Sequence, residues 1–318
     1  MSLVLINHAF TAGHQLTALT SELGYDLSCQ QLEVGPLLGF MRVVICGDQI
    51  FLMLSADKPL ALYGSRLTNY AAIGFYLSDF TKDIHCHAHG HKAVANWSSS
   101  FSPRHDETFC QIAPNVPMLV TYISHDSLRT SAKNWHELNA FDKILNKEFA
   151  VFHPEPYQRF IRASFYRLMN PSPDADYSLS SQMTLLTYEM FNQLNTDAKL
   201  QKTFKRYDLV ADFFKYAIVN QHHPVKIQDV ADALYTSNTT LIKGCYEFFG
   251  CKPMDVLKNI RLDQTHRALT NKSIQYELGF SKVLDIAKHY GFSSRPHFAK
   301  NFFEMYGLTP SDALKLAV

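Results

Sequence analysis

Apolar residues recur at helical spacing through the last third of the chain, in two stretches that resemble each other. Each stretch carries one apolar stripe at i, i+4 and i+7: Leu241, Cys245 and Phe248 in the first, and Phe298, Phe302 and Met305 in the second. A shorter apolar pattern with helical spacing precedes each stripe. The chain therefore predicts two pairs of helices, each pair joined by a tight turn.

The two stretches are a duplication. Segments 241–257 and 298–314 are identical at 6 of 17 positions, and their offset is 57 residues. Just upstream, Asp229-Val230-Ala231 recurs as Asp285-Ile286-Ala287. A repeat at a fixed offset indicates that one supersecondary unit has been built twice.

Start and stop signals agree with the stripes. In each copy a serine hydroxyl can accept a hydrogen bond from an N–H of the first helical turn. This serine is Ser237 in the first copy and Ser293 or Ser294 in the second. Gly250 and Gly307 follow the last helical residues, where a left-handed turn ends a helix. Proline then opens the following helix in both copies. We also expect a helix over 206–220 before the first pair and another over 255–269 between the pairs.

This arrangement resembles the DNA-binding domain of the AraC/XylS family of bacterial transcription regulators over residues 206–318. The most specific matching pieces are Ile286-Ala287…Gly291-Phe292-Ser293, Phe298…Lys300…Phe302 and Gly307…Thr309-Pro310. In the first copy, Val230-Ala231, Ser237, Leu241 and Gly250 match, and Arg261-Leu262 matches the start of the family's connecting helix. The resemblance implies two helix-turn-helix motifs whose second helices enter the DNA major groove.

The residues expected to face DNA lie opposite the buried stripes. They are Asn238, Thr239, Thr240 and Lys243 in the first copy, and Arg295, His297, Lys300 and Asn301 in the second. Lysine holds phosphate or a guanine edge, asparagine pairs with adenine, and the threonine methyl contacts thymine. The alternative for any one of these residues is a solvated helix face.

The chain departs from the family at three places. Lys243 and Lys300 stand where the family has arginine, so the charge remains but the planar fork is lost. Ile242 is apolar where a polar base contact is expected. The stretch 270–283 is longer than in common members, which predicts an extended loop or an extra turn before the second copy.

The N-terminal part has a different texture. Short runs rich in Val, Ile, Phe and Leu alternate with turn signals, at 37–46, 49–56, 70–77, 92–97 and 116–124. Residues 11–27 fit a helix. Many short strands at this spacing predict a β-sandwich or barrel, and the family resemblance implies a cupin-like sensor domain over residues 1–125.

Residues 126–205 are predicted to form a helical linker. The segments 156–169 and 180–194 have helical spacing, and 170–177 is a proline-containing break between them. The second segment has a broad apolar face that needs a cover. Both core packing and a homodimer contact satisfy that need.

Composition excludes few classes of protein. The 318 residues contain 47% hydrophobic and 19% charged residues, as in an ordinary globular chain of two domains. Net charge is +1, divided into +3 for residues 206–318 and −2 for residues 1–205. Six cysteines without a CxxC pair fit reduced thiols, and we expect a cytoplasmic protein without signal peptide, membrane span or cofactor.

One histidine cluster offers other chemistry. His85, His87 and His89 share a face if 85–91 is a strand, and with Cys86 and His91 they are possible ligands for zinc, copper or nickel. A catalytic cupin has a glutamate soon after its HxH, whereas the next one here is Glu107. Histidines without metal and a proton sensor are the other interpretations.

The sequence thus predicts an α+β protein with two domains: an N-terminal β-sandwich or barrel, a helical linker, and an all-α C-terminal domain. We expect a transcription regulator and not an enzyme, which binds double-stranded DNA through two recognition helices in successive major grooves. A small-molecule effector would act through the N-terminal domain. The alternative is a metal-binding cupin-like sensor or enzyme with an accessory DNA-binding domain.

Overall fold

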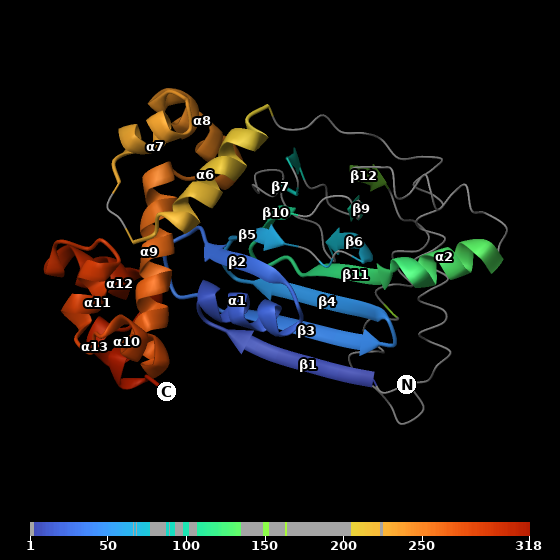
Figure 1. Ribbon diagram of the computed structural model, residues 1–318, viewed down its shortest axis with the longest axis horizontal. Coiled ribbons are helices and arrows are strands. Elements are labelled where there is room, and N and C mark those ends of the chain that lie inside the picture. Colours follow the sequence, from blue (N-terminus) through green and yellow to red (C-terminus); the bar gives the residue numbers. More distant parts are fainter. Residues whose placement is uncertain are drawn as a thin grey trace.

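The computed structural model describes residues 3–65, 67, 69–76, 87–88, 90–92, 98–101, 107–134, 149–152, 163, 205–222 and 225–318. Strands occupy the N-terminal part and helices the C-terminal part (Figure 1). In the part described, no helix combines the length and apolar character needed to cross a membrane.

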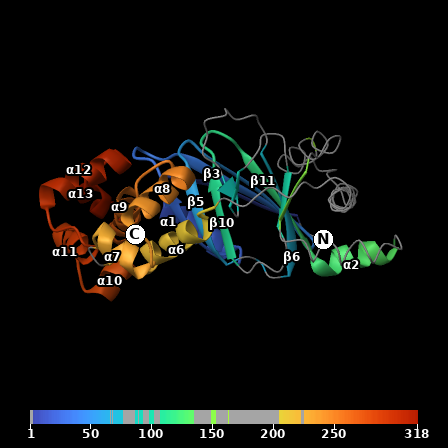
Figure 2. The ribbon, with the colours of Figure 1, turned by 90° about the horizontal axis from the view of Figure 1, so that it is seen from above.

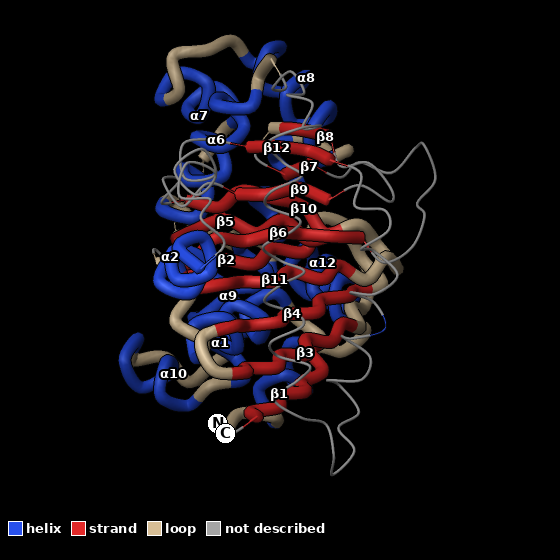
Figure 3. Tube along the Cα trace, turned by 90° about the vertical axis from the view of Figure 1, so that its right-hand side faces the viewer, coloured by secondary structure: helices blue, strands red, loops and turns tan. Residues whose placement is uncertain are grey.

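Two antiparallel sheets form the N-terminal part, and Figure 3 shows their strands stacked across the molecule. The first has the order β1-β3-β4-β11-β6-β9-β12, with bounds β1 Leu3–Phe10, β3 Gly39–Cys46, β4 Gln49–Ala56, β11 Met118–Ser124, β6 Tyr70–Tyr76, β9 Ser98–Phe101 and β12 Phe149–Phe152. The second has the order β2-β5-β10-β7-β8, with bounds β2 Asp26–Gln31, β5 Leu60–Ser65, β10 Glu107–Ile112, β7 His87–Ala88 and β8 His91–Lys92.

The two sheets bury one core between them. Val43 of β3 and Leu52 of β4, from the first sheet, belong to the same apolar cluster as Leu62 of β5 and Cys110 of β10, from the second. Helix α1 (Gly13–Glu22) joins β1 to β2 and adds Leu16 to this cluster. Helix α2 (His125–Asn134) follows β11. We call this part the β domain.

The C-terminal part is helical: α6 Tyr207–Val219, α7 Ile227–Ala233, α8 Asn238–Phe249, α9 Pro253–Thr270, α10 Lys272–Leu278, α11 Val283–His289, α12 Arg295–Tyr306 and α13 Pro310–Lys315. We call α7 with α8 the first helix pair and α11 with α12 the second. Helix α9 connects the pairs and runs along the boundary with the β domain, beside α1 and β2 (Figures 1 and 2). The extra length predicted at 270–283 is the short helix α10.

Most predicted elements are present, with shifted boundaries. The helix predicted over 11–27 ends at Glu22, because Asp26–Gln31 pairs with β5 instead. The sequence did not predict the strands β1, β2, β5, β7, β9 and β10. Of the run predicted over 92–97, all but the first residue lies outside the described residues. Residues 149–152 were predicted to be in a helical region, but they form β12, whose Phe-Ala-Val-Phe run pairs with β9. The predicted helices 156–169 and 180–194, and the break 170–177, lie outside the described residues.

Candidate nucleic-acid interface

The first helix pair begins with local capping. The Asp229 carboxylate accepts from the Lys226 backbone N–H at 2.9 Å, which fixes the start of α7. The Ser237 hydroxyl accepts from the Thr240 N–H at 3.1 Å and caps α8 as predicted. Gly250 ends α8 with φ 75°, also as predicted. The buried stripe therefore faces inward and the opposite face of α8 is turned to solvent.

The candidate DNA-facing residues of α8 lie on that opposite face. Thr239 and Lys243 are exposed, and Asn238 and Thr240 are half-buried. Asn238 donates from Nδ2 to Gln228 Oε1 at 2.7 Å, a bond that ties the start of α8 to α7. Gln228 was not predicted, since nothing in the apolar spacing marks a polar partner on the preceding helix.

The second helix pair has the same order of features. Pro296 lies in the first turn of α12, and Gly307 ends the helix with φ 70°. Ser294 is the N-cap residue, but its side chain makes no capping hydrogen bond. Phe298, Phe302 and Met305 are buried as predicted.

Three of the four candidate residues of α12 are exposed. They are Arg295, His297 and Lys300, while Asn301 is half-buried. Lys300 Nζ lies 3.8 Å from Glu304 Oε1, one turn later. The equivalent carboxylate in the first pair, Glu247, lies 2.6 Å from Arg206 Nη1 instead. Its ion pair thus ties α8 to the residue that precedes α6.

The β domain packs directly against α8 through aromatic rings. The ring of Phe248 stacks on Phe109 of β10, with centroids 4.8 Å apart, and on His87 of β7 at 4.9 Å. Gln111 Nε2 donates to the Phe248 carbonyl at 2.6 Å. The Gln111 amide oxygen also lies 3.2 Å from His87 Nδ1. The first helix pair therefore shares its core with the β domain.

The β domain also contacts α9, the helix between the pairs. Asn259 Nδ2 donates to the Leu32 carbonyl at 3.2 Å. Asp263 Oδ1 accepts from the His14 backbone N–H at 3.1 Å, so a carboxyl group of α9 caps the N-terminus of α1. His14 Nε2 lies 2.7 Å from His266 Nδ1. Gly13 is required there, because a Cβ would lie 2.4 Å from the Cys29 carbonyl oxygen.

Burial perturbs the titration of these three groups. Desolvation, together with the nearby His266 and Arg267, lowers the pKa of His14 to about 3. Desolvation also lowers the pKa of His266 to about 4. The pKa of Asp263 rises to about 7, again through burial, although hydrogen bonds from the backbone of His14 and Gly13 oppose the rise.

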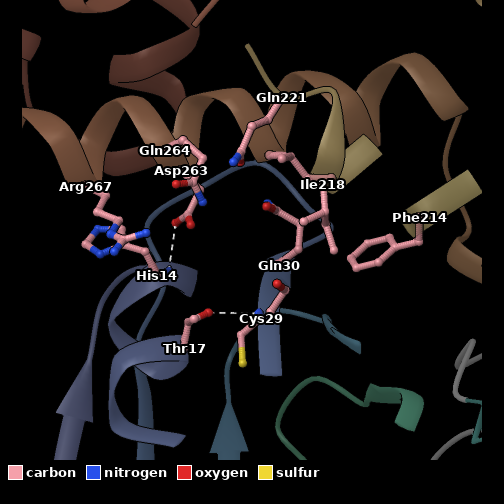
Figure 4. Close-up of a pocket in the computed structure, with 12 residues that line it drawn as sticks. His14, Thr17, Cys29, Gln30, Phe214, Ile218, Gln221, Asp263, Gln264 and Arg267 are labelled. Atoms are coloured by element: carbon pink, nitrogen blue, oxygen red, sulfur yellow. Dashed lines mark hydrogen bonds between the residues drawn. The ribbon is translucent and has the colours of Figure 1, made fainter. Parts of the chain in front are cut away.

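A cavity of about 130 Å³ opens beside this contact. Figure 4 shows His14, Asp263 and Arg267 on one side and Gln30, Ile218 and Phe214 on the other. The lining is mixed, with amide, carboxyl and guanidinium groups next to apolar side chains. It lies between α1 and β2 of the β domain and α6 and α9 of the helical part.

The predicted metal ligands are only partly described. His87 is buried between Gln111 and Phe248, whereas His85 and His89 lie outside the described residues. His91 is also buried. Among the described residues no group of three or more His, Cys, Asp or Glu side chains converges on a metal position. Metal binding through His85, His87 and His89 stays a prediction.

Residues 230–315, which include all of the second helix pair and the first pair except the start of α7, match the family described as a helix-turn-helix domain. This class of domain binds DNA by laying the second helix of the motif in the major groove. The domain in this chain is of the AraC type, as its sequence pattern indicates. Comparison with curated proteins finds no sequence match.

Several solved structures resemble the chain. A probable AraC family transcriptional regulator from Rhodopseudomonas palustris CGA009 is 25% identical over 35% of this chain and 99% of its own, with a TM-score of 0.32. The AraC-like transcriptional activator CuxR is 8% identical over 83% of this chain and 96% of its own, with a TM-score of 0.40. ToxT from Vibrio cholerae O395 is 15% identical over 100% of this chain and 98% of its own, with a TM-score of 0.33. The assignment rests on the sequence match of the C-terminal domain.

Proposed function

We propose that this protein is a transcription regulator that binds specific DNA sequences through α8 and α12. The observation that carries the proposal is the duplicated unit inside the matched domain, with a capped helix and an exposed polar face in each copy. Each pair acts as one helix-turn-helix motif, so the two recognition helices enter successive major grooves. The connecting helix α9 sets their spacing.

Charge supports a mode of binding that depends on a few cations. Residues 206–318 carry a net charge of only +3, so a broad positive field does not hold DNA. Lys243, Arg295 and Lys300 are exposed and anchor phosphates or guanine edges. Asn238, Thr239, Thr240, His297 and Asn301 supply the remaining polar contacts to DNA.

The β domain sets the activity of the helical domain. We assign it to residues 1–125, as a cupin-like sandwich to which 149–152 add the strand β12, with the rest of 126–205 as a linker that supports a homodimer and 206–318 as the DNA-binding domain. The contacts of β7 and β10 with α8, and of α1 with α9, support direct control of both recognition helices. A small-molecule effector acts by changing how the two domains are held. The protein then works on chromosomal DNA in the cytoplasm.

Replacement of both lysines tests the DNA-binding role. The double variant Lys243→Ala with Lys300→Ala should lose specific binding and keep its fold. Two fewer phosphate contacts should also reduce the slope of log affinity against log salt by about 2. Operator fragments are first selected from a genomic DNA pool, and affinity is then measured by fluorescence anisotropy at several salt concentrations.

A matched control separates the recognition face from overall charge. Lys272 and Lys315 are exposed on α10 and α13, and their double alanine variant loses the same two charges. It should retain operator affinity within about threefold. Equal losses in both double variants would show that the recognition face plays no special part, and the proposal would fail.

A further inference from the structure

The contact between α1 and α9 brings together three titratable side chains from two domains, of which Asp263 and His266 are buried and His14 is half-buried. His14 lies on α1, and Asp263 and His266 lie one turn apart on α9. With 2.7 Å between His14 Nε2 and His266 Nδ1, one imidazole must donate and the other accept. The pair is therefore satisfied with both rings neutral or with one of them charged. A second added proton places two donors face to face.

The same contact continues into the second recognition helix. The ring of His266 stacks on Tyr306, with centroids 4.3 Å apart, and lies 5.8 Å from Phe302. Both aromatic residues belong to α12, which also carries His297 and Lys300. The pair of imidazoles is thus one packed connection between the β domain and α12.

Other titratable groups of the described residues surround this contact. Arg267 on α9 faces His14 and Asp263, where it disfavours the charged imidazole and favours the charged carboxylate. The Cys29 thiol on β2 and the Tyr306 hydroxyl on α12 both face Asp263, and burial raises the pKa of each. Cys29 and Tyr306 therefore stay neutral through the range in which histidine titrates.

We propose that His14, His266 and Asp263 form a proton-balanced latch between the β domain and α9. A fall in pH favours opening of the latch by protonating the two imidazoles. The same fall in pH favours closure by protonating the Asp263 carboxyl group. His14 and Asp263 line the cavity beside this contact. The regulatory meaning of the latch rests on the proposed function, because α9 and α12 belong to the DNA-binding domain.

The two histidines and Asp263 contribute opposite pH dependences to closure of the latch. Each histidine has a lowered pKa in the closed state, so closure weakens as pH falls below the free value near 6.5, by about tenfold per pH unit for each ring. Asp263 has a raised pKa in the closed state, so closure strengthens as pH falls below about 7. Between pH 5 and 6.5, opening adds two protons to the imidazoles and removes one from the carboxyl, a net uptake of one.

Hydrogen exchange at the His14 backbone amide reports latch opening. That N–H donates to Asp263 across the boundary, so exchange with solvent requires this contact to open. NMR at several pH values, corrected for the intrinsic exchange rate, gives the opening constant without DNA. The amide of Val43, buried in β3, reports global unfolding for comparison.

The wild type and two variants together distinguish the latch from a merely structural contact. From pH 7.5 to 5.5, opening of the wild type should increase by less than about tenfold, because the two signs nearly cancel. Asp263→Asn keeps an acceptor but removes the opposing proton, so opening should increase about 100-fold. The double variant His14→Gln with His266→Gln should reverse the sign, and opening should decrease at pH 5.5.

Control variants carry the same substitutions at exposed positions, His8→Gln on β1 and Asp212→Asn on α6. Both should follow the wild type. If the double histidine variant does not fold, adding His14→Gln to Asp263→Asn should reduce the 100-fold effect to about tenfold. An Asp263→Asn protein with wild-type pH dependence would overturn the latch and leave the DNA-binding proposal untouched.

Discussion

The two helix pairs contain the same helices in the same order, but different neighbours hold them. The first shares its core with the β domain, since Phe109, Leu32 and Ala61 lie in the same apolar cluster as α8. The second packs mainly within the helical part, and Ala12 is the member of its cluster from the β domain. The duplicated unit thus keeps its C-terminal glycine and its apolar stripe, while the residues that pack behind it differ.

The buried phenylalanines test this difference most strongly. Phe248→Ala and Phe302→Ala should each lower the free energy of unfolding by about 3–5 kcal/mol, because both side chains are fully buried. Phe248→Ala should also loosen the β domain, since it removes the stacks on Phe109 and His87. Urea unfolding followed by circular dichroism measures the first effect, and hydrogen exchange of β10 measures the second.

An exposed ring on α12, next to Phe302, provides the control. Phe303 is 54% exposed, so Phe303→Ala should change stability by less than about 0.5 kcal/mol. If Phe302→Ala released β10 as much as Phe248→Ala, the two pairs would be coupled to the β domain equally. The different neighbours of the two pairs would then make no difference to the stability of the β domain.

Capping separates the pairs by a smaller amount. Ser237→Ala should cost about 1 kcal/mol, because the hydroxyl accepts the Thr240 N–H. Ser294→Ala should cost much less, since that side chain makes no capping bond. Thermal unfolding of the two variants at one pH measures the difference, and equal costs would contradict it.

The turn inside each pair gives the smallest effect, with opposite signs. Tyr235 adopts φ 50° in the first pair, where the second has Gly291 at 82°. Tyr235 is 98% exposed, so its side chain gains no packing energy that would offset this backbone strain. Tyr235→Gly should stabilise the protein by about 0.5–1 kcal/mol, and Gly291→Ala should destabilise it by a similar amount. The urea midpoints of both variants, compared with that of the wild type, test whether one variant is stabilised and the other destabilised.

The helical half of the fold was largely predictable from the sequence. Stripe spacing, Ser237, Gly250 and Gly307 act within a few residues, so local signals locate α8 and α12 closely. The short strand β12 was missed because its pairing partner β9 lies about fifty residues earlier in the chain. Strand signals of four residues are weak without that partner.

The candidate DNA-facing residues were predicted by the same local reasoning, and most of them are exposed. The domain contact was not predictable in this way. His14, Asp263 and His266 meet only because α1 packs on α9, and none of the three belongs to a sequence motif. Long-range polar contacts leave no periodic trace in a sequence.

The cap of α1 has a consequence for synthesis of the protein. Asp263 follows His14 by 249 residues, so at roughly 5–20 residues per second the first helix leaves the ribosome about 12–50 seconds before its cap. Until then the His14 N–H at the N-terminus of α1 has only water in place of the Asp263 carboxylate. The earliest helix to be made is therefore among the last to be completed, and a nascent chain that stops before α9 carries an unfinished β domain.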